Sequence, residues 1–105
     1  MNINSKKILK EDKEFIVIYA DNELFNLENQ IDLKSFIENN LSEGFYYFEI
    51  DMQAVSAITS SGLGILISIL NNIKKKDGIL NLVNLSEKIL KIFLITRLQL
   101  VFNIK

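Results

Sequence analysis

A single α/β domain is the fold class that the 105-residue sequence predicts, and three observations lead to this prediction. Short β-prone runs alternate with longer segments of helical periodicity, a pattern that favours a mixed or parallel sheet with right-handed crossover connections. Hydrophobic residues make up 49% of the chain, which is enough for one core in a chain too short for two domains. Proline is absent, and no Gly/Ser-rich linker or internal repeat breaks the pattern, so residues 1–105 are expected to form one domain.

The first half of the chain predicts a strand followed by a helix. Residues 14–20 are rich in β-branched and aromatic residues, which predicts the strand. Residues 27–41 are predicted to form the helix, with Asn26 as its N-cap and Asn39-Asn40 at its fraying end. Apolar residues recur in this segment at helical spacing: Leu33, Phe36, Ile37 and Leu41.

The middle of the chain predicts a strand, a helix and another strand. Residues 45–50 are expected to form a buried strand that leads to Asp51. The helix is expected over about 61–76 and should stop at Asp77-Gly78, because both residues suit a helix-ending turn. The strand that follows is predicted over residues 79–83.

The end of the chain predicts a last helix and a last strand. Ser86 is expected to open the helix. Its apolar side is predicted to consist of Ile89, Leu90, Phe93 and Leu94. A short strand over residues 101–104 should close the chain.

Three adjacent hydroxyl residues, Thr59, Ser60 and Ser61, stand where the predicted middle strand gives way to its helix. A helix start offers free backbone N–H groups and roughly half a positive charge, so it tolerates a phosphate or an acidic partner. The segment is therefore a candidate regulatory contact. The alternative is that Ser60 and Ser61 only cap the helix, which stabilises a helix by about 1 kcal/mol.

The residue types on which many enzymes depend are missing. The chain has no histidine and no cysteine, which excludes Ser-His-Asp hydrolysis, imidazole acid–base catalysis, thiol nucleophiles, disulfides and His- or Cys-ligated zinc. The carboxylates form no recognisable catalytic or calcium-loop pattern, and there is no GxxxxGK(S/T) phosphate loop. The chain is therefore expected not to be an enzyme and to have no catalytic residue, cofactor or metal site.

Charge and hydropathy narrow the range of partners. The net charge of −1 at pH 7 excludes a strongly basic nucleic-acid binder. The cluster Lys74-Lys75-Lys76 is expected to be a solvated helix end, with a partner or lipid contact as the alternative. No apolar run approaches the ~20 residues that span a bilayer, and no apolar segment follows Lys6-Lys7 as it would in a signal peptide. A cytoplasmic location is therefore expected.

Residues 51–64 carry a family resemblance. Their sequence, DMQAVSAITSSGLG, resembles D-L-S-x-V-x-x-I-D-S-S-G-L-G, the signature of STAS domains and specifically of the bacterial anti-sigma-factor antagonists. Residues 77–84 are similar to the turn and strand that follow in this family, and residues 92–104 are similar to its closing segment. The resemblance thus covers nearly the whole chain.

The resemblance implies a phosphorylation-controlled switch, built on a mixed sheet of four or five strands with helices packed against it. Unphosphorylated members bind an anti-sigma factor that is often also a serine kinase, and this binding frees a sigma factor for transcription. Phosphorylation of the motif serine, which is Ser60 in this chain, ends the binding, and a separate serine phosphatase reverses it. The implied partner-binding residues are Asp51, Thr59, Ser60, Ser61, Gly62, Leu63 and Gly64.

The chain departs from the family pattern at three positions. Thr59 replaces the aspartate beside the acceptor, so it cannot supply that negative charge to a kinase, and it joins Ser61 as a lesser candidate for modification. Phe25 holds the aspartate position of a G-x-L-D turn and is expected to face the core, with a docking patch as the alternative. Arg97 replaces a glycine and is expected to alter only a turn.

The two glycines of the motif call for a separate explanation. A glycine costs a helix about 1 kcal/mol, so Gly62 and Gly64 indicate either close packing or docking. For Gly64, contact between the helix and the sheet is the expectation.

Two further functions stay open at this point. One is a constitutive scaffold, a STAS module in a larger signalling or transport assembly that is never phosphorylated, and Thr59 is the main reason for it. The other is a small enzyme or nucleotide-binding domain, which the missing histidine, cysteine and phosphate loop disfavour. The residue pattern does not decide between a monomer and a dimer.

Overall fold

A five-stranded sheet in the order β1-β2-β3-β4-β5 forms the centre of the computed structural model, which describes residues 3–105. Residues 1 and 2, which belong to the predicted domain and to the segment tested for a signal peptide, lie outside the described residues. β1 runs antiparallel to β2, whereas β2, β3, β4 and β5 run parallel to one another, so the predicted mixed sheet is confirmed. The strands are β1 (Ser5–Lys10), β2 (Lys13–Asp21), β3 (Tyr47–Ala54), β4 (Ile79–Val83) and β5 (Asn103–Ile104).

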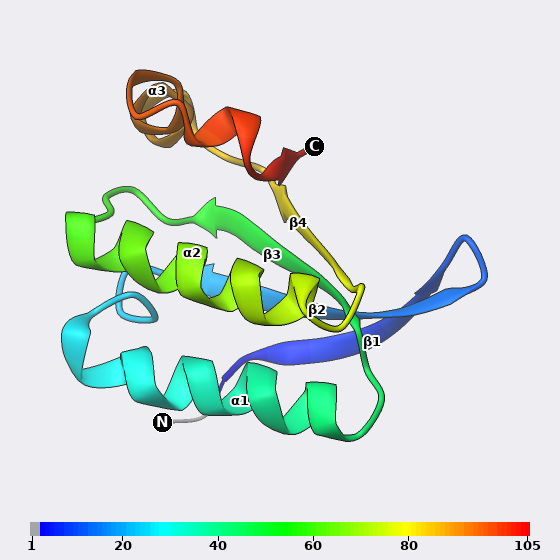
Figure 1. Ribbon diagram of the computed structural model, residues 1–105. Coiled ribbons are helices and arrows are strands. Elements are labelled where there is room, and N and C mark those ends of the chain that lie inside the picture. Colours follow the sequence, from blue (N-terminus) through cyan, green and yellow to red (C-terminus); the bar gives the residue numbers. More distant parts are fainter. Residues whose placement is uncertain (1–2) are drawn as a thin grey trace.

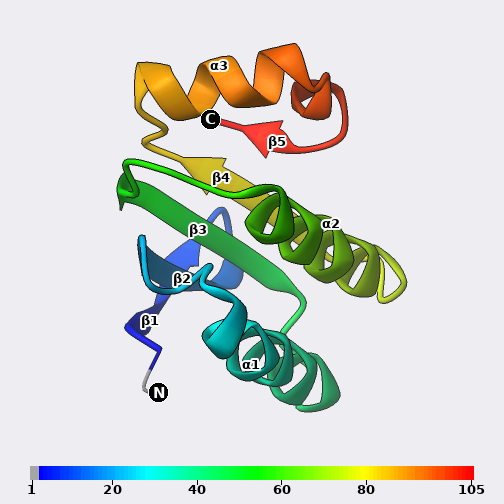
Figure 2. The same cartoon turned by 90° about the vertical axis from the view of Figure 1, so that its left-hand side faces the viewer.

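Three α-helices and two short 3-10 helices connect the strands. They are η1 (Leu27–Asn29), α1 (Gln30–Ser42), α2 (Ser60–Lys74), α3 (Glu87–Ile95) and η2 (Leu98–Leu100). Figures 1 and 2 show α1 and α2 side by side on one face of the sheet, with α3 beyond β4. Hydrogen bonds join Gln30 to Ser61 at the helix starts and Glu38 to Asn72 further along, so the two helices run in the same direction.

Alternate strand residues form the core beneath the helices, as the two-residue period of a strand requires. On β3, for example, Phe48, Ile50 and Met52 are fully buried. The buried helical residues that pack with the strands are Leu33, Ile37 and Leu41 from α1, Leu66, Ile69, Leu70 and Ile73 from α2, and Ile89 and Phe93 from α3. Three of the four apolar positions predicted for the first helix are therefore buried, and the fourth, Phe36, is half-buried.

The first strand, β1, was not predicted. Its sequence, SKKILK, contains three lysines and lies at the edge of the sheet, where four of its six residues are exposed. Lysines protect an edge strand from pairing with other chains, and they also hide its strand character in the sequence. The turn to β2 consists of Glu11 and Asp12, both with positive φ (52° and 65°). Two-residue hairpins adopt such turns most often with Asn-Gly, a signal that Glu-Asp does not give.

Several predicted boundaries are wrong by a few residues. Asn26 occupies the predicted N-cap position before Leu27, with an extended backbone, but its side chain makes no cap hydrogen bond, and the segment opens as the 3-10 helix η1. The α1 helix continues past Asn39-Asn40 to Ser42. The strand predicted over 45–50 runs from 47 to 54, so Asp51 lies inside it. The α2 helix begins at Ser60 and ends at Lys74, whereas the strand over 79–83 is confirmed.

The end of the chain shows two further differences. Leu94, predicted on the apolar side of the last helix, is 50% exposed because α3 buries only Ile89 and Phe93 fully. The predicted strand 101–104 is reduced to two residues, since η2 occupies the preceding segment. Arg97 has a φ of 61°, a left-handed conformation that glycine adopts more easily, so the change from glycine affects a turn, as expected.

The predicted stop at Asp77-Gly78 is confirmed, and its geometry depends on a glycine. Asp77 has a φ of 57°, and the Gly78 N–H donates to the Ile73 carbonyl oxygen at 3.0 Å. A Cβ atom on residue 78 would collide with the Tyr46 backbone oxygen and would lie 2.7 Å from Ile73 Cγ2. The turn after α2 therefore approaches the residue before β3 more closely than a side chain at position 78 would permit.

We predict that Gly78→Ala lowers the free energy of unfolding by about 1–3 kcal/mol, because the added methyl group has no space. Gly64→Ala is the matched control, since a Cβ atom there would meet nothing within 4 Å. That variant should be unchanged or up to about 1 kcal/mol more stable, because alanine favours a helix over glycine. Urea denaturation followed by circular dichroism measures both. Equal stability of the two variants would show that Gly78 is not needed for close approach.

Candidate functional site

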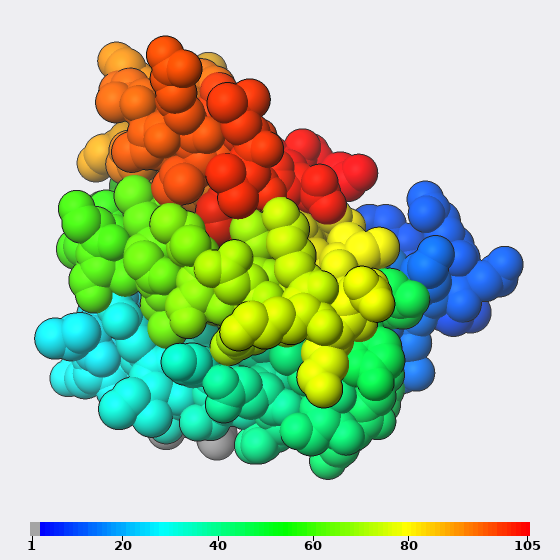
Figure 3. Space-filling model, viewed as in Figure 1, coloured from blue at the N-terminus to red at the C-terminus, as the bar shows by residue number. Residues whose placement is uncertain are grey.

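The three hydroxyl residues lie at the carboxyl edge of the parallel strands. β2 and β3 end at this edge, and the connections that leave them lead into η1–α1 and α2. Figure 3 shows the start of α2, in green, directly above the start of α1, in cyan, on the surface of the molecule. In open α/β sheets, this edge is where binding sites form.

Thr59 is the N-cap of α2. Its backbone is extended, with φ −88° and ψ 168°, and its Oγ1 accepts a hydrogen bond from the Gly62 N–H at 3.0 Å. Ser60 and Ser61 are already helical residues. The alternative that these two serines cap the helix is therefore wrong, because the extended backbone that a cap needs belongs to the residue before them.

Ser61 is tied to the neighbouring helix. The Gln30 side-chain amide donates to Ser61 Oγ at 2.8 Å and to the Phe25 carbonyl oxygen at 3.1 Å. This amide joins the start of α1 to the start of α2 across 31 residues of sequence.

Ser60 differs from both neighbours. Its side chain is exposed, and among residues 3–105 its hydroxyl has no hydrogen-bond partner. Of the three adjacent hydroxyl groups, this one alone is free to react without the loss of a structural contact.

The electrostatic surroundings suit an added negative charge on Ser60. The first turn of α2 contains no acidic residue, so the positive end of its dipole is not already neutralised from within that turn. The start of α1, joined through the Gln30 amide, lies alongside and carries its own acids, Glu28 and Asp32, so the favourable contribution comes from α2. A phosphate on the first residue of α2 would therefore lie close to free backbone N–H groups.

The start of α2 approaches the buried residue Phe25 closely. Phe25 is 3% exposed, so the prediction that it faces the core is confirmed. A Cβ atom on Gly62 would lie 3.2 Å from Phe25 Cβ and 2.8 Å from Ile58 Cγ1. Gly62 therefore allows the helix to approach Phe25 and the side chain of Ile58 in the loop before it.

Gly64 behaves differently from Gly62. It is exposed, and a Cβ atom there would meet nothing within 4 Å. The expected contact between Gly64 and the sheet is wrong, because the residue lies on the outer side of α2. Leu63, between the two glycines, is half-buried.

Asn22 fixes the loop that precedes α2. Its Oδ1 accepts hydrogen bonds from the Ser56 N–H at 2.8 Å and the Ala57 N–H at 3.3 Å, and its Nδ2 donates to Ser56 Oγ at 2.8 Å. Neither Asn22 nor Gln30 was identified from the sequence. Asparagine prefers turns, which is a weak sequence signal for the role of Asn22. No local sequence pattern indicates that Gln30 contacts Ser61.

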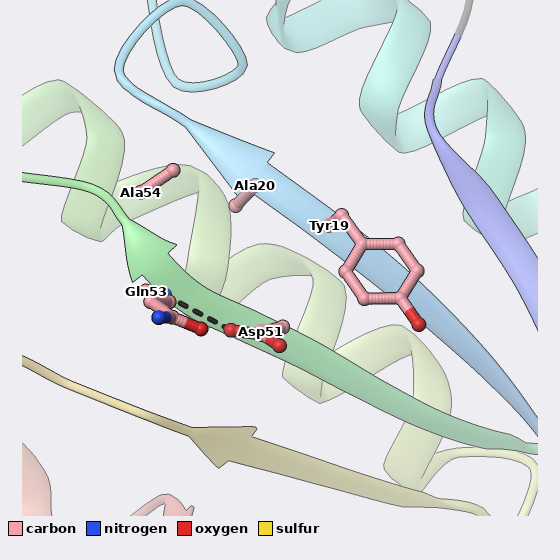
Figure 4. Close-up of a pocket in the computed structure, with 5 residues that line it drawn as sticks. All are labelled: Tyr19, Ala20, Asp51, Gln53 and Ala54. Atoms are coloured by element: carbon pink, nitrogen blue, oxygen red, sulfur yellow. Dashed lines mark hydrogen bonds between the residues drawn. The ribbon is translucent and has the colours of Figure 1, made fainter.

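Asp51 lies away from the hydroxyl groups. It occupies the face of β3 opposite to Ile50 and Met52, where its Oδ1 accepts a hydrogen bond from the Gln53 N–H at 3.0 Å. Asp51 lines a hollow of about 380 Å³ beside a shift in the β2–β3 register. Figure 4 shows its side chain and the hydrogen bond to Gln53. The residues that line this hollow are Tyr19, Ala20, Asp51, Gln53 and Ala54. Thr59 lines a different, smaller depression of about 200 Å³ together with Asn22 and Phe25.

Comparisons with known proteins agree with this architecture. The sequence pattern that defines the STAS domain matches residues 6–105. The NMR structure of TM1081 is 25% identical to this chain, covers 94% of it and 78% of TM1081, and has a TM-score of 0.81. The crystal structure of TM1081 from Thermotoga maritima is described as that of a candidate anti-sigma factor antagonist. It is 22% identical to this chain, the match covers 95% of this chain and 84% of TM1081, and the TM-score is 0.75.

A second relative is the anti-sigma factor antagonist SpoIIAA of Bacillus, whose structure is known in unphosphorylated and phosphorylated forms. The unphosphorylated form is 17% identical, covers 97% of this chain and 87% of SpoIIAA, and has a TM-score of 0.69. At this identity the likeness shows the shared fold. No curated protein sequence matches the chain significantly. Within residues 3–105, no helix has both the length and the apolar character that crossing a membrane requires.

We predict that Thr59→Ala lowers the free energy of unfolding by about 1 kcal/mol, because the Gly62 N–H loses its acceptor. Ser60→Ala should change it by no more than about 0.5 kcal/mol, since the Ser60 hydroxyl makes no contact. Thr59→Ser, which keeps the accepting oxygen, should restore most of the loss. Thermal denaturation of the three variants compares them directly. A larger loss for Ser60→Ala than for Thr59→Ala would contradict the assignment of the cap.

Proposed function

The chain belongs to the STAS domain family, and on this premise we propose that it is an anti-sigma factor antagonist switched by phosphorylation of Ser60. In its unphosphorylated form it binds an anti-sigma factor that is also a serine kinase, and this binding frees a sigma factor in the cytoplasm. Phosphorylation by that kinase ends the binding, and a separate serine phosphatase restores it. The chain itself acts by binding and catalyses no reaction.

One observation carries this proposal: Ser60 has the only unengaged hydroxyl group of the three. Thr59 Oγ1 accepts from the Gly62 N–H, and Ser61 Oγ accepts from the Gln30 amide. A kinase must bring the acceptor oxygen to the γ-phosphate of ATP, and an exposed hydroxyl without an intramolecular partner needs no rearrangement to reach it. Ser60 meets this requirement better than its neighbours.

The physical effect of the phosphate differs between the folded chain and its complex. Phosphorylation adds about 1.5 to 2 negative charges, which the start of α2 accommodates. The domain therefore keeps its fold. A partner surface fitted to a neutral hydroxyl would instead bury a doubly charged group without counter-charges, at a cost of several kcal/mol. The switch acts at the interface.

Gly64 and the outer side of α2 support the same location for the interface. Gly64 has no packing reason for lacking a side chain, because a Cβ atom there would meet open space. The close approach of a partner backbone is a physical reason for an exposed glycine near a helix start. The proposed contact residues around Ser60 are Thr59, Ser61, Gly62, Leu63 and Gly64, with Asp51 on a more distant rim.

Relatives also support the proposal, although each is a separate protein. TM1081 and SpoIIAA share the fold, and SpoIIAA is known in a phosphorylated form. Thr59 supports the second candidate, a scaffold module that is never phosphorylated, because the acidic residue that the family places beside its acceptor is absent. Phosphorylation assays separate the two candidates.

We predict that the cognate anti-sigma factor kinase with ATP adds one phosphate to the wild-type chain and that the phosphate is on Ser60. Ser60→Ala should gain no mass, whereas Ser61→Ala should still gain one phosphate, because its hydroxyl is held by Gln30. Intact-mass and fragment mass spectrometry give both results. No added mass with a kinase that is active and binds the chain would favour the scaffold, and a phosphate on Thr59 or Ser61 would exclude Ser60 as the acceptor.

We predict that Ser60→Asp weakens binding to that kinase by at least tenfold, which corresponds to about 1.4 kcal/mol. Ser60→Asn is the matched control, since it has the same shape without the charge, and it should bind more tightly than Ser60→Asp. Isothermal titration calorimetry measures the affinities, and circular dichroism should be unchanged. Equal affinities of the aspartate and asparagine variants would sink the electrostatic mechanism.

A further inference from the structure

Two large aliphatic side chains at the start of the first helix project into solvent. Leu27 is 76% exposed and Ile31 is 78% exposed. Leu27 lies in η1 and Ile31 in the first turn of α1, so the two residues are about one helical turn apart in one continuous segment. We call them the α1 pair.

The core of the domain gives no reason for the α1 pair. The buried side of α1 is defined by Leu33, Ile37 and Leu41. Ile31 precedes Leu33 by two residues, which is about 200° around a helix, so it points away from the core. A single exposed aliphatic residue is ordinary, but two within one helical turn beside a candidate site indicate an interaction surface.

The α1 pair is continuous with the hydroxyl site. Gln30 lies directly before Ile31, and its amide donates to Ser61 Oγ at 2.8 Å. The same amide donates to the Phe25 carbonyl oxygen at 3.1 Å, which fixes the segment that leads into Leu27. Figure 3 shows the two helix starts as one unbroken surface, cyan beside green. A partner that covers Ser60 is therefore next to the α1 pair.

The charges around the α1 pair indicate the chemistry of the partner. Glu23 and Glu28 are exposed on the segment that carries Leu27, and the first base that follows on this element is Lys34. An apolar centre with a charged rim is the usual composition of a protein interface. The complementary surface is apolar at its centre and carries lysine or arginine at its edge.

We infer that Leu27 and Ile31 anchor the chain on the anti-sigma factor, in an apolar groove whose basic side chains face Glu23 and Glu28 and not Ser60. This inference rests on the proposed function and adds to it a separation of roles. The α1 pair sets the affinity of the complex, and Ser60, at the border of the pair, sets its response to phosphorylation. The kinase consequently holds its substrate through residues that the phosphate does not modify.

The test uses the full chain and the purified anti-sigma factor kinase that phosphorylates it. Leu27→Ser and Ile31→Ser should each weaken binding about tenfold, and the double variant about a hundredfold, because each loses a buried aliphatic contact. Ile95→Ser and Leu100→Ser are the matched controls, since these side chains are 72% and 75% exposed at the α3–η2 end of the chain. Both controls should bind within twofold of wild type. Circular dichroism should show the same fold for all variants.

A kinetic measurement separates docking from chemistry. The rate of Ser60 phosphorylation is measured as a function of the concentration of the chain. The Leu27→Ser and Ile31→Ser variants should keep the wild-type kcat but raise KM about tenfold. Glu28→Gln should reduce the dependence of affinity on salt, whereas Glu43→Gln, an exposed acid at the other end of α1, should not.

The outcomes distinguish this inference from the proposed function. Wild-type affinity for the Leu27→Ser and Ile31→Ser double variant, with Ser60→Asp still impaired, overturns the inference and leaves the proposed function in place. A wild-type chain that neither binds nor is phosphorylated by any anti-sigma factor kinase of its source organism overturns both. An equal loss in the Ile95→Ser control would place the contact elsewhere and also overturn the inference.

Discussion

The parallel pairing of β2 and β3 is the constraint on which the rest of the structure depends. Its register runs from Phe15 opposite Tyr47 to Tyr19 opposite Asp51, and both strands bury alternate side chains beneath α1 and α2. Parallel strands begin at the same edge of a sheet, so the chain must cross back after each one. The η1–α1 segment and α2 therefore both start at the carboxyl edge. The adjacency of the two helix starts is a result of topology, and the polar contacts between them follow from it.

This adjacency gives three neighbouring hydroxyl groups different surroundings. The Thr59 hydroxyl oxygen accepts a hydrogen bond from the backbone of its own helix, and the Ser61 hydroxyl oxygen accepts one from Gln30 of α1. Modification of either residue would have to break a hydrogen bond that holds the site together. Modification of Ser60 breaks none within the described chain. If the proposed phosphorylation takes place, this arrangement directs it to the one unengaged hydroxyl group of the three.

The sequence predicts those parts of the structure whose signals are local. The stop of α2 at Asp77-Gly78 and the strand 79–83 are examples, because turn chemistry and β-branched residues act within a few positions. β1 could not be predicted, since its lysine-rich sequence is stabilised by contacts with distant residues, namely pairing with β2 and the ion pair of Lys10 with Glu49. The helix cap could not be assigned either, because three adjacent hydroxyl residues are equivalent in sequence. Contacts made over long sequence distances, such as Gln30 with Ser61, decide between them.

The two positions where this chain lacks an acidic residue of the family pattern are not equivalent in physical terms. Thr59 is exposed and keeps the capping oxygen that an aspartate would supply, so the change removes a charge and little else. Phe25 is buried against the region of Gly62, and a carboxylate there would be costly to bury without a partner. The core therefore fixes the residue at position 25, whereas position 59 accepts any residue that keeps a capping oxygen. Of the two positions, 59 is the one where the charge beside Ser60 can change without loss of the cap or of core packing.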